Sequence, residues 1–122
     1  MGYNDYYLYG IILDGCPYSM AAKELLEENI KRHEIFMVTH NNKEDYKNEC
    51  IDTFPQIYLR KYNSDFSELI GGYDDFRKIY DTVKHARSSK TIKSKVLKLL
   101  KGDIRDKEKS GLIISHIILD TK

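Results

Sequence analysis

The chain has 122 residues, 41% hydrophobic and 32% charged, a size that predicts one domain with its own hydrophobic core. Its longest apolar run, residues 112–119, is too short to span a membrane, and no Cys or His pair has zinc spacing, so we expect a soluble cytoplasmic protein without metal. The net charge is +1, but residues 77–101 hold nine Lys or Arg against one Asp; without an aromatic platform or nucleic-acid motif, we interpret them as a solvated helix face and expect no nucleic-acid partner.

The first third of the chain predicts a strand, a helix and a second strand. Residues 6–13 are aromatic and β-branched and end at Asp14-Gly15, which is typical of a strand followed by a turn. Pro17 suits the first turn of a helix, and apolar residues then recur at helical spacing. Residues 34–39 predict another strand. Because a helix separates the two strands, we expect them to be parallel.

The middle of the chain predicts a short surface helix, a hairpin and two further helices. The surface helix is expected at residues 41–50. The hairpin has strands at 56–60 and 66–70 with a turn at 63–65. Asp74 or Asp75 can cap the first of the two further helices, and the second is expected at 91–101, before Gly102.

The end of the chain holds a very apolar segment. Six of the eight residues at 112–119 are Leu or Ile, so we expect this segment to be covered rather than left in water. The isoleucines favour a strand that pairs with a sheet edge of its own chain or of a second chain, which makes the protein a monomer or a weak dimer. A helix laid on the basic helix is the alternative.

Cys16 is the residue with the clearest chemical role. It follows the first predicted strand and directly precedes Pro17, where the first helix begins. Unpaired N–H groups and the positive end of the helix dipole stabilise a thiolate at such a place. The thiolate is the reactive form in thiol–disulfide exchange. A buried, inert cysteine is the alternative interpretation.

Three short motifs, in the same order on the predicted elements, resemble the glutaredoxin family. Residues 16–19 (Cys-Pro-Tyr-Ser) resemble its active-site tetrad, with Ser19 in place of the second cysteine. Residues 53–58 (Thr-Phe-Pro-Gln-Ile-Tyr) resemble its segment with a cis proline, and residues 71–76 (Gly-Gly-Tyr-Asp-Asp-Phe) resemble the segment before its third helix. The resemblance covers roughly residues 6–101.

The resemblance implies a thioredoxin-like three-layer α/β fold, with a central four-stranded mixed sheet flanked by helices. Residues 1–102 would form this glutaredoxin-like domain. Residues 103–122 would be a short C-terminal extension that packs on the domain or pairs with it.

The resemblance also implies a glutathione-dependent thiol–disulfide oxidoreductase that acts by a monothiol route on glutathionylated proteins or small mixed disulfides. Cys16 is then the nucleophile, Tyr18 flanks the sulfur of glutathione, and Ser19 holds the position of the resolving thiol. The backbone before the proline pairs with the cysteinyl part of glutathione, and an aspartate faces its ammonium group. The implied glutathione-binding residues are Phe54, Pro55, Gly72, Tyr73 and Asp74.

The sequence departs from the family pattern where glutathione places its glycyl carboxylate. Leu13, Asp14 and Asp52 stand where the family usually has basic residues, so we expect loose glutathione binding. Lys43 or Lys47 is an alternative source of that contact.

Three further alternatives remain open. Cys50 is a candidate for a second, resolving thiol. An iron–sulfur cluster held between two chains by Cys16 and glutathione is a second alternative. A catalytically weak interaction module on the same fold, using the acidic body or the C-terminal extension, is the third.

Overall fold

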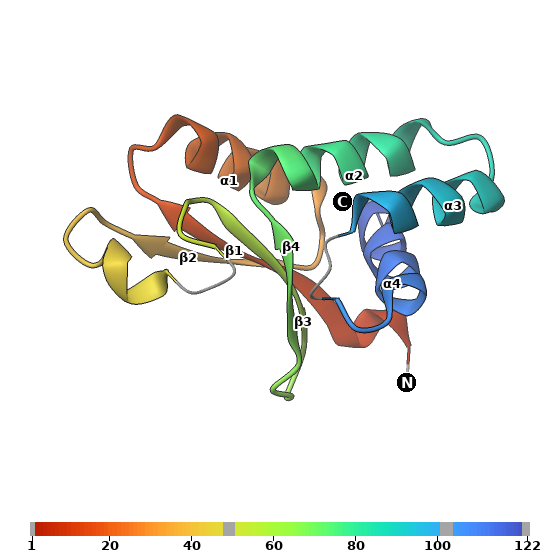
Figure 1. The fold of residues 1–122 in the computed structure, drawn as a ribbon, viewed down its shortest axis with the longest axis horizontal. Coiled ribbons are helices and arrows are strands. Elements are labelled where there is room, and N and C mark those ends of the chain that lie inside the picture. Colours follow the sequence, from red (N-terminus) through yellow and green to blue (C-terminus); the bar gives the residue numbers. More distant parts are fainter. Residues whose placement is uncertain (1, 48–50, 101–103, 121–122) are drawn as a thin grey trace.

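In the computed structural model, which describes residues 2–47, 51–100 and 104–120, a four-stranded sheet carries four α-helices (Figure 1). The strands are β1 (Tyr6–Leu13), β2 (His33–Val38), β3 (Gln56–Lys61) and β4 (Ser67–Gly71). The helices are α1 (Pro17–Asn29), α2 (Tyr73–His85), α3 (Ser89–Leu99) and α4 (Lys107–Leu119). Two short 3₁₀ turns are η1 (Tyr3–Asp5) and η2 (Lys43–Tyr46).

The strands lie in the order β2-β1-β3-β4. β1 and β2 are parallel, as the helix between them predicts, and β3 runs antiparallel to both of its neighbours. The predicted hairpin of β3 and β4 is confirmed, and Asn63 in its turn has a left-handed backbone (φ 56°). This sheet with α1 between β1 and β2, and α2 after the hairpin, is the expected thioredoxin-like α/β fold.

One face of the sheet is covered by α1 and α2, which lie side by side above it in Figure 1. Leu8 and Ile12 point from β1 into this main core, where they meet Leu26 of α1 and Phe76 of α2. Gly10 allows the close approach of α1, because a Cβ there would stand 2.9 Å from Cδ1 of Leu26. The main core therefore fixes α1, and with it the residue that precedes Pro17.

The opposite face of the sheet holds a smaller core. Ile11, Leu13 and Val38 are buried there. The segment with η2 lies on this side, and its Tyr46 packs against these residues. The prediction of a surface helix at 41–50 is therefore wrong for its described residues, 41–47, which form only the 3₁₀ turn at 43–46. Cys50 lies outside the described residues.

The strand favoured at residues 112–119 is wrong: this segment lies in helix α4. The side chain of Asp106 accepts the N–H of Lys109 and caps the helix. Four isoleucines are buried on it, namely Ile113, Ile114, Ile117 and Ile118, against α2, α3 and β1. As a helix, the segment directs its apolar side chains toward all three of these elements and buries them. The free energy gained by this burial outweighs the β preference of isoleucine. The extension therefore completes the main core and offers no strand for pairing at 112–119.

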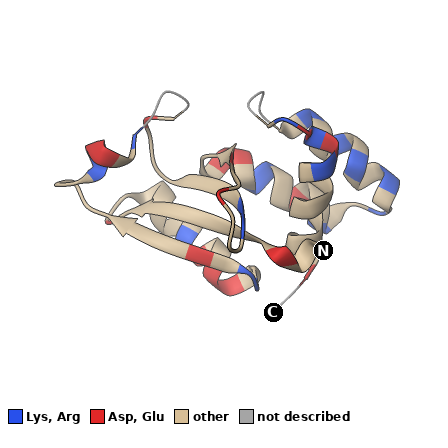
Figure 2. Ribbon diagram, turned by 90° about the horizontal axis from the view of Figure 1, so that it is seen from below, with Lys and Arg blue, Asp and Glu red and all other residues tan. Residues whose placement is uncertain are grey.

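Helices α2 and α3 carry the basic block on their outer sides. α3 begins after Ser88, whose Oγ accepts the N–H of Thr91 at 3.2 Å, and it ends at Leu99, earlier than predicted; Gly102 lies outside the described residues. Figure 2 shows the basic residues as blue bands on these helices at one end of the molecule. Their exposed members include Lys84, Arg87, Lys90, Lys93, Lys95 and Lys98.

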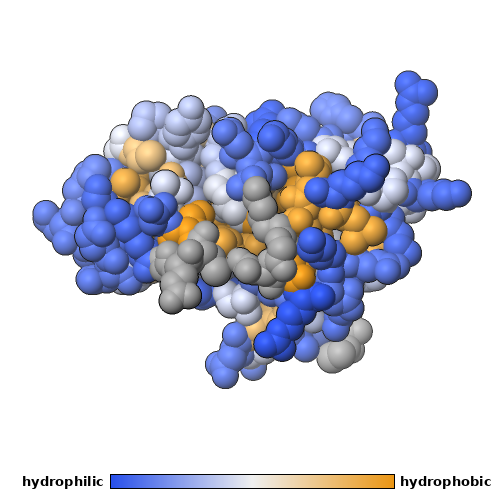
Figure 3. All heavy atoms as spheres, viewed as in Figure 1, coloured by the Kyte–Doolittle hydropathy of each residue, from blue (hydrophilic) through white to orange (hydrophobic). Residues whose placement is uncertain are grey.

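The surface seen in the view of Figure 1 is largely hydrophilic, with hydrophobic residues in limited areas (Figure 3). Within the described part of the chain, every helix is too short or too polar to pass through a membrane.

Candidate functional site

Cys16 lies at the junction of β1 and α1, as predicted. Gly15 has a positive φ of 79°, which a glycine adopts freely, and the turn closes with the N–H of Cys16 donating to the carbonyl of Leu13 at 3.1 Å. Cys16 is the N-cap of α1, and Pro17 is the first helical residue. The half-buried Cys16 therefore stands at the amino end of a helix of 13 residues, where unpaired backbone N–H groups and the positive end of the helix dipole lie.

A second segment meets the thiol of Cys16 from the start of β3. The peptide bond between Phe54 and Pro55 is cis, as the sequence resemblance implies. The Sγ atom of Cys16 lies 4.0 Å from the carbonyl oxygen of Phe54, across 38 positions of sequence. The fold thus brings two of the three motifs together at one point.

A groove of about 690 Å³ opens beside this point, a volume in the range of small-ligand sites. It is formed by the start of α1, the segment before β3, the end of β4 and the start of α2. The residues that line it are Tyr18, Ile51, Asp52, Thr53, Phe54, Pro55, Leu69, Gly71, Gly72, Tyr73, Asp74 and Asp75. Six of the eight site residues that the sequence indicated are among them, and Cys16 borders the groove through Phe54.

Two tyrosines flank the groove from different helices. Tyr18 is 61% exposed in the first turn of α1, and Tyr73 is half-buried at the start of α2. Their ring centres are 6.3 Å apart and their planes are tilted by 44°. This pair offers aromatic surface to an apolar or sulfur-containing part of a ligand.

The two aspartates at the start of α2 have separate tasks. Asp75 caps the helix, because its Oδ2 accepts the N–H of Gly72 at 3.1 Å. Gly71 (φ 141°) has to be glycine, since a Cβ there would collide with the side chain of Asp75. Asp74 is exposed and lines the groove, and its carboxylate has no hydrogen bond or ion pair with any residue that the structure describes. Asp74 is therefore available to a ligand.

Ser19 differs from the other predicted site residues in its position. It is fully buried, and its Oγ accepts the N–H of Leu13 at 3.1 Å. The hydroxyl group therefore ties the end of β1 to the first turn of α1 instead of lining the groove.

Leu13 does not face the groove, contrary to the sequence interpretation. It is buried in the smaller core with Ile11 and Val38, because the alternation of β1 turns its side chain to that face of the sheet. Asp52 does line the groove and is exposed. Lys47 pairs with Glu44 at 2.9 Å, and this contact lowers the pKa of Glu44.

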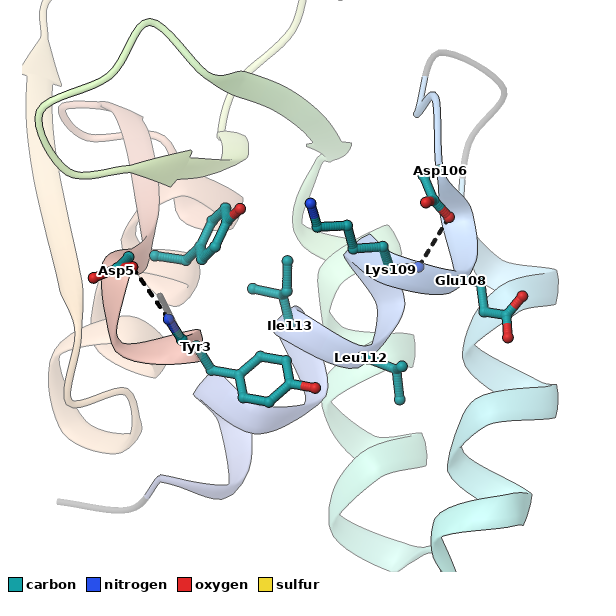
Figure 4. A pocket seen from close by; sticks show the side chains of 9 residues that line it. Tyr3, Asp5, Asp106, Glu108, Lys109, Leu112 and Ile113 are labelled. Atoms are coloured by element: carbon teal, nitrogen blue, oxygen red, sulfur yellow. Dashed lines mark hydrogen bonds between the residues drawn. The ribbon is translucent and has the colours of Figure 1, made fainter.

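A second hollow, of about 490 Å³, lies between η1 and the amino end of α4 (Figure 4). Tyr3 of η1 and Ile113 of α4 line it, and Asp106 is engaged in the cap of α4. No cysteine is among the described residues that line this hollow. Over residues 2–47, 51–100 and 104–120, no group of three or more His, Cys, Asp or Glu could hold a metal ion.

No sequence pattern pointed to Ile51 and Leu69, which add apolar surface to the groove. Their only signal was closeness in the chain to two of the motifs.

Comparison with protein-family models gives no match. Comparisons with curated proteins and with solved structures give none either. Function is therefore inferred from the site itself.

Proposed function

We propose that the protein is a glutathione-dependent thiol–disulfide oxidoreductase that uses Cys16 by a monothiol route. The observation that carries this proposal is the position of the Cys16 thiol, at the amino end of α1 and 4.0 Å from the carbonyl oxygen of Phe54, at the border of the groove. The helix end favours the thiolate, and the groove gives room for the partner that bears the other sulfur.

The chemistry consists of two exchange steps. The Cys16 thiolate attacks the glutathione sulfur of a glutathionylated protein or a small mixed disulfide. A disulfide forms between Cys16 and glutathione, the original disulfide breaks, and the substrate leaves as a thiolate that takes a proton from water. The thiolate of a second glutathione then attacks the sulfur of the bound one. This releases oxidised glutathione and restores the Cys16 thiolate.

The groove residues suit the parts of glutathione by their chemistry. The backbone of Phe54, before the cis bond to Pro55, can pair with the cysteinyl residue in the manner of an added strand. The carboxylate of Asp74 can accept hydrogen bonds from the ammonium group of the γ-glutamyl end. Tyr18 and Tyr73 can flank the sulfur and the adjoining chain.

The two-cysteine route should be poor, because the residue three positions after Cys16 is Ser19. Its hydroxyl group cannot form a disulfide, and it is already hydrogen-bonded to Leu13. Protein disulfides that need an intramolecular resolving thiol are therefore expected to be weak substrates.

The test is the reduction of the mixed disulfide of glutathione and 2-mercaptoethanol, coupled to glutathione reductase. We expect the wild type to turn over and Cys16→Ser to lose the activity, because the substitution removes the nucleophile. Cys50→Ser is expected to keep it. Activity in Cys16→Ser would overturn the proposal, and an inactive wild type would favour the interaction module.

A further inference from the structure

The proposed groove carries negative charge on two of its walls. Asp52 lies in the segment before β3 and Asp74 at the start of α2, and both side chains are exposed. Asp75 also lines the groove, but its carboxylate accepts the N–H of Gly72. Among the described residues that line the groove there is no Lys or Arg. A ligand therefore meets two solvent-facing carboxylates and no basic side chain from these residues.

Two basic residues near the groove are already matched by acids. Arg77, one turn after Tyr73 on α2, has its Nε 3.1 Å from both carboxylate oxygens of Asp81. The hydrogen bond and charge of Asp81 raise the pKa of Arg77. Lys47, directly after η2, is 2.9 Å from Glu44. Backbone N–H groups at the starts of α1 and α2 suit one anionic group of a ligand, but they leave the charge of the two aspartates in place.

Building on the proposed function, we infer that the groove selects thiol and disulfide partners whose sulfur lies close to positive charge. These are amine-bearing small thiols, or a cysteine flanked by Lys or Arg. Glutathione is a weaker occupant, because at neutral pH it has one more carboxylate than ammonium group. Its ammonium group can match Asp74, while its net charge is repelled by the pair of carboxylates.

The exchange step is unchanged by this preference. The Cys16 thiolate attacks the sulfur of the cationic partner, the new disulfide joins the two, and the other half of the original disulfide leaves and takes a proton from water. Glutathione then attacks the Cys16 sulfur of this mixed disulfide, forms a disulfide with Cys16 and releases the cationic thiol. A second glutathione attacks the bound glutathione, so that oxidised glutathione leaves and the Cys16 thiolate is restored.

The size of the preference follows from Coulomb's law. One charge at about 6 Å from an exposed carboxylate changes association by roughly twofold at about 0.1 M salt. A partner with one positive charge and a partner with one negative charge differ by two charges. Each of these charges interacts with both aspartates, so the twofold effects multiply to a rate ratio of about tenfold. The ratio should shrink towards one at about 1 M salt, where the screening length is about 3 Å.

The experiment uses three short peptides in which one cysteine is flanked by Lys, by Ser or by Glu. Each is supplied as its mixed disulfide with 2-mercaptoethanol, and the rate of peptide attachment to Cys16 is followed by intact mass. Each rate is divided by the rate at which the same mixed disulfide reacts with a small neutral thiol in solution. This ratio removes differences in the intrinsic reactivity of the three disulfides. We expect the Lys peptide to attach about tenfold faster than the Glu peptide at low salt.

Charge variants show whether the two aspartates cause the preference. Asp52→Asn combined with Asp74→Asn should bring the ratio of Lys to Glu rates close to one. Asp52→Lys, in which the new positive charge offsets that of Asp74, should do the same. Asp65→Asn, in the hairpin turn and outside the groove, should leave the ratio unchanged. Cystamine and oxidised glutathione, used as small probes, should follow the same order as the peptides.

The outcomes separate this inference from the proposed function. Equal normalised rates for the three peptides, or a tenfold ratio that survives in the double variant, overturn the inference and leave the exchange chemistry standing. If no disulfide reacts faster with the wild type than with Cys16→Ser, the proposed function fails, and the inference fails with it.

Discussion

Replacing Ser19 with alanine is expected to weaken the fold and to leave the chemistry of Cys16 in place. Ser19 is fully buried, and its Oγ accepts the N–H of Leu13 at the end of β1. Without the hydroxyl group, this N–H loses its acceptor inside the protein. A buried N–H without a partner costs about 1–3 kcal/mol.

The expected change in melting temperature follows from the length of the chain. At about 2.1 cal/mol/K of unfolding entropy per residue, a chain of 122 residues shifts by about 4 °C for each kcal/mol. Ser19→Ala should therefore melt about 4–12 °C below the wild type. Thermal unfolding followed by circular dichroism measures this shift. Ser94→Ala is the matched control, because Ser94 is exposed on α3, and it should change the free energy of unfolding by less than about 0.5 kcal/mol.

Exchange activity distinguishes a structural role of Ser19 from a chemical one. At a temperature where Ser19→Ala is folded, its rate with a mixed disulfide should stay within about twofold of the wild type, since the monothiol route needs only Cys16. An unchanged melting temperature would show that the contact between Ser19 and Leu13 contributes nothing. A stable variant that has lost its activity would show that Ser19 acts in the chemistry.

Three other predictions concern the packing and the charges of the fold. Ile117→Ala should lower the free energy of unfolding by about 2–5 kcal/mol in denaturant titrations, because Ile117 is fully buried; Leu119→Ala, at a side chain that is 49% exposed, should cost far less, and equal losses would contradict the packing of α4. Arg32→Ala removes the donors to the backbone carbonyls of Tyr3 and Tyr6 and the ion pair with Asp120. It should therefore lower the free energy of unfolding by about 1–3 kcal/mol and speed amide exchange in α4. Unchanged exchange there would show that this contact does not hold the helix. Burial raises the pKa of Tyr9 above 10.0. The contribution of Tyr9 to stability is therefore complete below that pH and is lost as the pH rises through its folded-state pKa. In urea titrations, Tyr9→Phe should lose less stability than the wild type between about pH 8 and about pH 11, and an equal loss would refute this.

The sequence by itself determined most of the local elements and most of the candidate site. The bounds of β1 and the start of α1 at Pro17 follow from patterns that neighbouring residues set by themselves: a β-branched run, a glycine turn and a proline at the first helical position. The same holds for the hairpin turn at Asn63. Six of the eight predicted site residues line one groove, because the motifs lie at element ends that this topology brings to one edge of the sheet.

Only the tertiary structure decided which sides of these elements are buried and which meet a ligand. Residues 112–119 form a helix because their isoleucines are covered by three other elements, and no local preference contains that information. Leu13 is buried and Ser19 is bound to its backbone, since the sheet and α1 meet there. The charge of the groove also arises from the fold: Asp52 and Asp74 are 22 positions apart in the sequence, and the hairpin of β3 and β4 between them brings both to the walls of one cavity.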